Sequence, residues 1–124
     1  TVNGFEDHRK VRAVAETPGE GRVLVVDGGG SLRTGLMGDQ MAELAMNNGW
    51  IGAVINGPVR DSRAIDKLDF GVKALGTTAL RGIDEIGGLV DLPVSFGGIE
   101  FRSGWWVYAD ADAVIVSETE LPPL

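Results

Sequence analysis

Short apolar runs alternate with segments of helical periodicity through the first half of the chain. Three runs bounded by charged residues or glycine predict buried strands: Val23–Val26, Gly52–Ile55 and Gly71–Leu75. Three segments predict helices: Phe5–Glu16, Asp39–Asn48 and Ser62–Leu68, the last with Ser62 as its expected N-cap. Because strands and helices alternate, this half predicts a β-α-β arrangement with parallel strands.

The second half of the chain has a different pattern. Residues 76–89 predict a loop, and four short β-like runs then follow, separated by glycine and aspartate turns: Leu92–Val94, Ile99–Phe101, Trp105–Tyr108 and Ala113–Val116. These runs predict a β meander. The whole pattern therefore indicates one α/β domain over residues 1–124, with a parallel first half followed by the meander.

Composition narrows the classes of protein that fit. The 124 residues are 44% hydrophobic, which is enough for a buried core, and their net charge of −7 argues against a nucleic-acid-binding surface. No apolar run approaches the roughly 18 residues that a membrane span needs. The absence of cysteine excludes disulfides and cysteine nucleophiles, and it favours a cytoplasmic location.

A glycine-rich segment, residues 27–38, follows the first long strand and raises the possibility of a nucleotide site. Gly28-Gly29-Gly30 would supply the first two glycines of a dinucleotide-binding turn, but Arg33 stands where the third belongs. The next strand ends in Asn56-Gly57 rather than in a ribose-binding acid, and no Gly-Lys-Ser/Thr follows the glycines. We therefore interpret the three glycines as a tight turn beneath a pocket and Arg33 as a surface residue.

Polar residues at the ends of the two predicted strands suggest a different site. Gly38 to Met41 open the second helix, whose free N–H groups favour an anion, and Arg60-Asp61 follow the next strand. Carboxyl ends of parallel strands meet at one edge, where ligands bind. A guanidinium suits a carboxylate ligand, and an aspartate suits a hard divalent cation. Taken alone, Asp39 is better interpreted as a helix cap than as a site residue.

Three segments carry a resemblance to a known family: VLVVDGGGSLRTGLMGDQMAELA at 23–45, GAVINGPVRD at 52–61 and PVSFGGIEFRSGWWVYAD at 93–110. They resemble the RraA-like family, which includes class II 4-hydroxy-4-methyl-2-oxoglutarate (HMG) aldolases with oxaloacetate decarboxylase activity and regulators of ribonuclease activity. The family pattern of Asp, twenty residues and Arg-Asp matches Asp39 and Arg60-Asp61. The resemblance implies a swivelling β/β/α fold, a homotrimer or dimer of trimers, and an N-terminal segment in relatives that is missing before Thr1.

The resemblance also implies roles for individual residues. Gly38, Asp39, Gln40, Met41 and Arg60 would bind a small 2-keto acid, with Asp39 and Arg60 catalytic. Asp61 would hold a divalent cation, Mg²⁺ or Mn²⁺, and cleavage would proceed through a pyruvate enolate. The motif contains no lysine, which disfavours a Schiff-base aldolase. Two alternatives remain open: a non-catalytic protein that binds and inhibits a ribonuclease, and an oligomer with a vestigial site.

The remaining polar and aromatic residues are expected to be structural. His8, the single histidine, is predicted to lie on the surface away from the motif. Asp110 and Asp112 have a spacing that could hold a metal, but aspartate in a turn between strands is the commoner explanation. Trp105 and Trp106 would face opposite sides of a strand, one toward the core and one toward a neighbouring subunit.

Overall fold

The computed structural model describes residues 1–82 and 87–123. It contains three helices: α1 (Arg9–Ala15), α2 (Asp39–Asn47) and α3 (Ser62–Ile65). The strands of the first half are β1 (Val2–Asn3), β2 (Val23–Asp27), β3 (Gly52–Asn56), β4 (Pro58–Val59), β5 (Gly71–Lys73) and β6 (Gly76–Thr77). Those of the second half are β7 (Leu89–Val90), β8 (Val94–Phe96), β9 (Ile99–Phe101), β10 (Trp106–Ala109) and β11 (Val114–Ser117).

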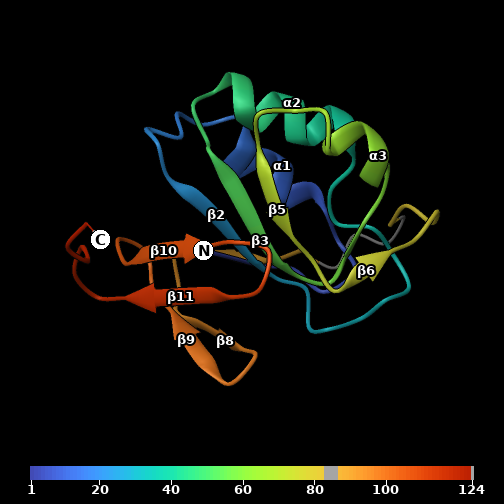
Figure 1. The fold of residues 1–124 in the computed structure, drawn as a ribbon. Coiled ribbons are helices and arrows are strands. Elements are labelled where there is room, and N and C mark those ends of the chain that lie inside the picture. The colour runs from blue at the N-terminus through green and yellow to red at the C-terminus, as the bar shows by residue number, and fades with distance from the viewer. Residues whose placement is uncertain (83–86, 124) are drawn as a thin grey trace.

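A five-stranded sheet with the order β5-β3-β2-β1-β7 forms the middle of the molecule. Neighbours among β1, β2, β3 and β5 are parallel, and β7 is antiparallel to β1. The chain crosses from β1 to β2, β3 and β5 in one direction, with a helix in each crossover. Because such crossovers are right-handed, all three helices lie on one face of the sheet, as Figure 1 shows.

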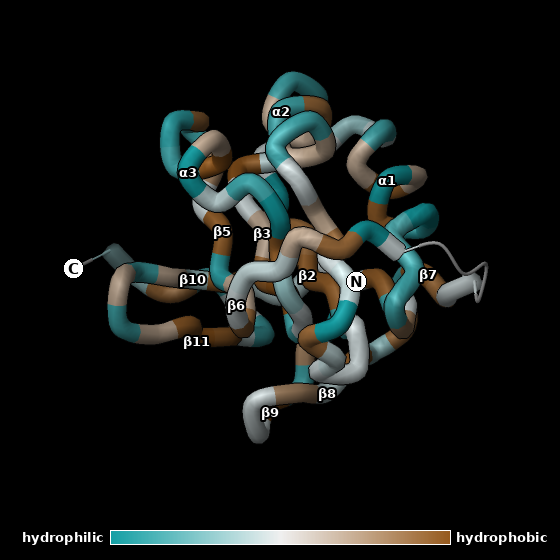
Figure 2. The backbone as a smooth tube through the Cα atoms, turned by 90° about the vertical axis from the view of Figure 1, so that its right-hand side faces the viewer, coloured by the Kyte–Doolittle hydropathy of each residue, from teal (hydrophilic) through white to brown (hydrophobic). Residues whose placement is uncertain are grey.

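The opposite face of the sheet carries the β meander, so the molecule has three layers (Figure 2). Alternation along the strands builds a separate core on each side. In β2, Leu24 and Val26 face the helices, whereas Val25 packs against Val94 and Phe101 of the meander. The same alternation in β3 places Ile55 on the helix side. The predicted β/β/α fold class is confirmed.

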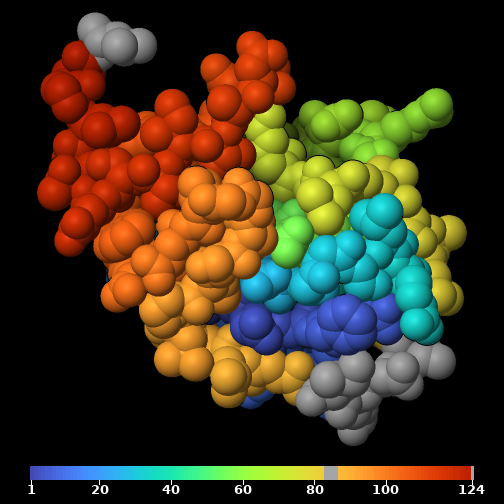
Figure 3. All heavy atoms as spheres, turned by 90° about the horizontal axis from the view of Figure 1, so that it is seen from below, coloured from blue at the N-terminus to red at the C-terminus, as the bar shows by residue number. Residues whose placement is uncertain are grey.

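The meander consists of two antiparallel hairpins, β8–β9 and β10–β11. Gly97 and Gly98 both have positive φ, +62° and +79°, which is what a two-residue hairpin turn requires. Asp110 accepts hydrogen bonds from the N–H groups of Asp112 and Ala113, so its role is that of a turn residue, as expected. Seen from below, the orange and red residues of the meander and the C-terminal segment lie together on one side of the molecule (Figure 3).

Several boundaries differ from the sequence-based prediction. The first helix begins at Arg9 and not at Phe5, because Glu6 has a positive φ of 52° and Phe5 lies in a turn, 47% exposed. The two-residue strand β1 was not predicted. Asp61, not Ser62, is the N-cap residue of α3. In the predicted loop at 76–89, residues 76–77 and 89–90 form strands, and residues 83–86 lie outside the described part. No helix among the described residues is long and apolar enough to cross a bilayer.

Candidate active site

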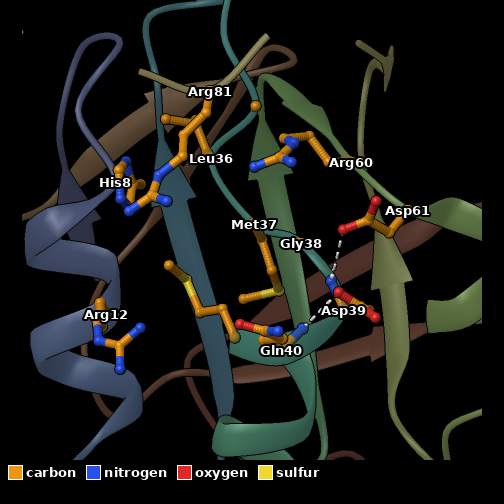
Figure 4. A pocket seen from close by; sticks show the side chains of 12 residues that line it. His8, Arg12, Leu36, Met37, Gly38, Asp39, Gln40, Arg60, Asp61 and Arg81 are labelled. Atoms are coloured by element: carbon orange, nitrogen blue, oxygen red, sulfur yellow. Dashed lines mark hydrogen bonds between the residues drawn. The ribbon is translucent and has the colours of Figure 1, made fainter. Parts of the chain in front are cut away.

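A cavity of about 220 Å³ lies at the carboxyl ends of the parallel strands, where the chain passes from each strand toward the next helix. Its size falls below the roughly 300–1,000 Å³ of pockets for drug-sized ligands, so it suits a small metabolite. The lining residues come from the start of α1, the loop before α2, the turn before α3 and the segment after β6: His8, Arg12, Gly35, Leu36, Met37, Gly38, Asp39, Gln40, Met41, Arg60, Asp61 and Arg81 (Figure 4).

The triple glycine packs against Leu36, which lines the cavity, and other protein atoms occupy the space around its backbone. The N–H groups of Gly28 and Gly30 donate to the carbonyl oxygen of Asn56 at 3.1 and 3.2 Å. Asp27 Oδ1 accepts from the Gly29 N–H and from the Asn56 amide, both at 2.9 Å. A Cβ on Gly28 would lie only 2.3 Å from Leu36 Cδ1. These contacts make the glycines a tight turn, as predicted, and not a phosphate cradle.

After the glycines, residues 35–37 lie between residues 58–60 and residues 80–81 and are hydrogen-bonded to both. On one side, the Leu36 N–H donates to the Pro58 carbonyl at 3.0 Å, and the Arg60 N–H donates to the Met37 carbonyl at 2.8 Å. On the other side, the Gly35 N–H donates to the Leu80 carbonyl at 2.8 Å, and Gly35 forms a parallel bridge with Arg81. Residues 35–37 therefore bring the two strand-end segments, and their arginines, to one cavity.

Two carboxylates lie at the start of α2. Asp61 Oδ2 accepts from the Asp39 N–H at 3.3 Å, and Asp39 Oδ1 accepts from the Gln40 N–H at 2.9 Å. Negative charge is stabilised at this end of a helix by the unpaired N–H groups and the helix dipole. Asp61 adopts a left-handed backbone conformation, with φ 56° and ψ 40°. This conformation is uncommon outside glycine, and aspartate adopts it more readily than most residues do.

Gly38 is required for this close approach. It is the N-cap residue of α2, and a Cβ at this position would lie 2.9 Å from Asp61 Oδ2. Only a residue without a side chain leaves the Asp61 carboxylate where it stands, against the helix N-terminus. The glycine before Asp39 therefore has a packing reason, independent of any backbone contact to a ligand.

All six residues predicted from the sequence line the cavity: Gly38, Asp39, Gln40, Met41, Arg60 and Asp61. Among the described residues, the Arg60 guanidinium has no recorded hydrogen bond or ion pair, and it points across the cavity (Figure 4). Two of the α2 N–H groups expected to meet a ligand instead donate to Asp39 and Asp61. The Met41 side chain is 7% exposed and belongs to the helix-side core.

The prediction for His8 is wrong: the half-buried imidazole lines the cavity at the N-cap of α1. Arg12 and Arg81 were not predicted either. His8 was missed because strand β1 was not predicted. A helix that follows a parallel strand begins at the same edge of the sheet as α2, so β1 places the start of α1 and His8 at the cavity. Nothing in the local sequence around Arg81 indicates its place, which depends on the distant pairing with Gly35.

Charge and burial both act on His8. Burial lowers the pKa of its imidazole below the ordinary value, and the positive charge of Arg81 lowers it further; Asp7 acts in the opposite direction, and Arg12 and Arg60 add to the lowering. The net effect favours the neutral form of the imidazole. Its Nδ1 is buried and has no hydrogen-bond partner among the residues that the structure describes.

The donor set for a metal is small. No group of three or more His, Cys, Asp or Glu side chains among the described residues could enclose a metal ion. Asp61, with Asp39 beside it, offers carboxylate oxygens at an exposed position. This arrangement fits Mg²⁺, which keeps several waters and commonly takes only one or two protein carboxylates. It does not fit a structural zinc site, which needs four closely placed ligands.

The fold and the cavity together define a class: a three-layer β/β/α domain whose cavity combines arginines and aspartates at the ends of parallel strands. The chain belongs to the RraA-like family, whose Aldolase/RraA model matches residues 1–116. Proteins of Aromatoleum aromaticum and Arabidopsis thaliana, each named "putative 4-hydroxy-4-methyl-2-oxoglutarate aldolase" (number 3 in Arabidopsis), are 50% and 49% identical over 121 residues. Both alignments cover 98% of this chain, and they cover 76% and 73% of the respective relatives.

Two solved structures have the same fold. The RNA-processing inhibitor RraA from Thermus thermophilus is 40% identical with a TM-score of 0.92, covering 99% of this chain and 74% of that one. A Geobacillus kaustophilus protein described as an S-adenosylmethionine:2-dimethylmenaquinone methyltransferase is 43% identical with a TM-score of 0.93, covering 97% and 74%. Proteins given three different activities therefore share this architecture, so the activity must be argued from the cavity.

Proposed function

We propose that this protein cleaves 4-hydroxy-4-methyl-2-oxoglutarate to pyruvate in a reaction that depends on a divalent metal, and that it also decarboxylates oxaloacetate. The observation that carries the proposal is the meeting of Arg60, Asp61 and Asp39 in one metabolite-sized cavity at the N-terminus of α2. The names of the relatives from Aromatoleum and Arabidopsis support the aldolase reaction.

Arg60 binds the substrate and stabilises negative charge. Its guanidinium, which has no recorded partner among the described residues, can take the 2-keto acid end of the substrate through paired N–H donors. Cleavage breaks the C3–C4 bond, and its electron pair goes to the 2-keto acid fragment as a pyruvate enolate. A fixed cation close to that developing charge lowers the barrier, which is usually the largest single contribution to catalysis.

Asp61 and Asp39 divide the remaining work. Asp61 would hold the cation, which would supply positive charge to stabilise the developing enolate. Asp39 orients a water that accepts the proton of the C4 hydroxyl and returns a proton to C3 of the enolate. In HMG this gives two pyruvates; in oxaloacetate the same bond breaks with release of CO₂, and only the C3 protonation is needed. The N–H groups at the start of α2 orient both carboxylates.

Two substitutions that each remove one charge test this assignment. Arg60→Gln and Asp61→Asn should each lower kcat/KM for pyruvate release from HMG and oxaloacetate by about 100-fold or more, the usual effect of removing one stabilising charge. EDTA should abolish activity of the unchanged protein, and Mg²⁺ or Mn²⁺ should restore it. Arg63→Gln is the matched control, because Arg63 is exposed on α3 and does not line the cavity. Full activity of either cavity variant, or of the protein in EDTA, contradicts the proposal.

The second candidate is a non-catalytic inhibitor of a ribonuclease. The likeness to the RNA-processing inhibitor RraA of Thermus, at 40% identity, favours it. An inhibitor that acts through its surface has no need for a carboxylate held in a left-handed conformation inside a cavity. Absence of pyruvate release, together with ribonuclease inhibition that Asp61→Asn leaves unchanged, would support this candidate over the aldolase.

A further inference from the structure

The cavity holds more positive charge than the proposed reaction uses. Arg12, Arg60 and Arg81 line it against two aspartates, in a chain whose net charge is −7. Arg12 is paired with Glu16, Nε to Oε1 at 3.1 Å. Arg60 serves the 2-keto acid end of the substrate. Arg81 has neither a partner among the described residues nor a role in cleavage.

The position of Arg81 is set by the backbone. Its bridge to Gly35 and the neighbouring hydrogen bond from the Gly35 N–H to the Leu80 carbonyl fix the main chain at the rim. On the opposite side of Gly35 lies Arg60, whose Cγ would be 2.5 Å from a Cβ on residue 35. The two arginines therefore flank one residue, and both side chains enter the same cavity (Figure 4).

Neither aspartate of the cavity forms a hydrogen bond or ion pair with Arg81. Asp39 and Asp61 are hydrogen-bonded to N–H groups of α2, beyond Arg60. The acid that acts on His8 is Asp7, which already accepts hydrogen bonds from the Arg9 side chain and from the Gly87 N–H. Within the described part of the chain, no carboxylate forms an ion pair with Arg81.

His8 lies beside Arg81. In Figure 4 the Arg81 side chain extends toward the imidazole, and Arg81 is the charge that acts most strongly on it. A neutral imidazole can donate one hydrogen bond to a carboxylate, and a guanidinium can donate two in parallel. Together they supply the donors that a carboxylate-binding site needs, at the other end of the cavity from Asp61.

We propose that Arg81 and His8 form a second anion subsite that binds the distal carboxylate of the substrate. The cavity then selects 2-keto acids that carry two carboxylates over those that carry one. This inference rests on the proposed function for the identity of the substrate, but the subsite itself is a binding property. It assigns specificity to Arg81 and His8 and leaves the cleavage to Arg60, Asp61 and Asp39.

Substrate pairs test the selectivity. HMG is compared with the analogue in which a methyl group replaces the distal carboxylate. Arg81→Gln should raise KM for HMG about tenfold, the effect of losing one charged hydrogen-bonding partner at a partly exposed site, and should leave kcat/KM for the analogue unchanged. Arg63→Gln should alter neither. An equal loss for both compounds, or no loss for HMG, overturns the subsite.

The single histidine allows a second test that needs no catalysis. With ¹⁵N-labelled histidine, only His8 reports in the imidazole spectrum. 2-Oxoglutarate, a dicarboxylate that lacks the hydroxyl needed for cleavage, should raise the His8 pKa because its second carboxylate lies beside the ring; pyruvate should not. Arg81→Gln should abolish most of that rise.

The two proposals fail in different ways. A His8 response to 2-oxoglutarate but not to pyruvate, in a protein without aldolase activity, keeps the subsite and rejects the proposed reaction. Saturable binding of 2-oxoglutarate, followed through backbone resonances of Arg60, with an unchanged His8 titration rejects the subsite whatever the activity. The titration in Arg81→Gln distinguishes a carboxylate held by this pair from one bound elsewhere in the cavity.

Discussion

At the scale of single residues, Asp7 holds the turn that carries His8 into the cavity. It is 2% exposed, and its carboxylate accepts from Arg9 Nη2 at 2.7 Å and from the Gly87 N–H at 2.8 Å. These bonds fix the turn between β1 and α1, and so the position of His8. The hydrogen bonds from Arg9 hold the pKa of the Asp7 carboxyl far below its ordinary value, although burial opposes them.

Replacement of this carboxylate should be costly in a pH-dependent manner. Asp7→Asn should lower the free energy of unfolding at pH 7 by about 1–3 kcal/mol, because hydrogen bonds to a charged group are lost. Since the folded-state pKa is depressed, the stabilisation is complete above the unfolded-state pKa of about 4 and is lost as pH falls below it. Urea titrations from pH 7 to pH 2.5 measure this difference, with the exposed Asp69→Asn as control. A constant difference across that range would show that charge is not the cause.

At the scale of elements, the site follows from β-α units whose strands are parallel. Periodicity alone located β2, α2 and β3, and the Asp39 to Asp61 spacing then identified residues that do share a cavity. His8 and Arg81 could not be found in this way. One depends on the two-residue strand β1 and on a bond from Gly87 to Asp7, and the other on pairing across forty-six positions with Gly35. Non-local contacts of this kind leave no periodic signal in the sequence.

A substitution at the start of α2 can test metal binding separately from the stability of the fold. Gly38→Ala places a Cβ 2.9 Å from Asp61 Oδ2, the mobile end of a side chain, so the carboxylate turns away while the helix remains. The free energy of unfolding should change by less than about 1 kcal/mol, and the affinity for Mn²⁺, measured by electron paramagnetic resonance, should fall about tenfold. Gly71→Ala, where a Cβ meets nothing within 4 Å, is the control. Unchanged Mn²⁺ affinity in Gly38→Ala would remove Asp61 from the metal site.

At the scale of the whole molecule, the candidate site and the meander core lie on opposite sides of the sheet. Every residue that lines the cavity lies between His8 and Arg81, on the helix side or at the strand ends. The meander builds its own core against the far face, where Phe101 is 2% exposed and stacks on Phe96 with ring centroids 4.6 Å apart. The two cores lie on opposite faces of the central strands, so damage to one need not reach the other.

Truncation in the meander core should therefore affect stability and leave the cavity intact. Phe101→Ala should reduce the free energy of unfolding by about 3–5 kcal/mol, the usual cost of removing a buried phenyl ring. In the protein that remains folded, backbone amide chemical shifts of Arg60 and Asp61 should match those of the unchanged chain. Phe5→Ala, at a position 47% exposed, should alter stability little. Large shifts at Arg60 or Asp61 in Phe101→Ala would show that the layers are coupled.

The left-handed backbone at Asp61 has a consequence for how this site can change by mutation. Few residue types tolerate that conformation, chiefly glycine, asparagine and aspartate. Asparagine and glycine are each one nucleotide away from an aspartate codon. Single-nucleotide changes at this codon therefore include two, to asparagine and to glycine, that remove the Asp61 charge and preserve the turn. A lineage with this fold can therefore lose the proposed metal ligand in a single step, keep its shape, and remain available for selection on its outer surface alone.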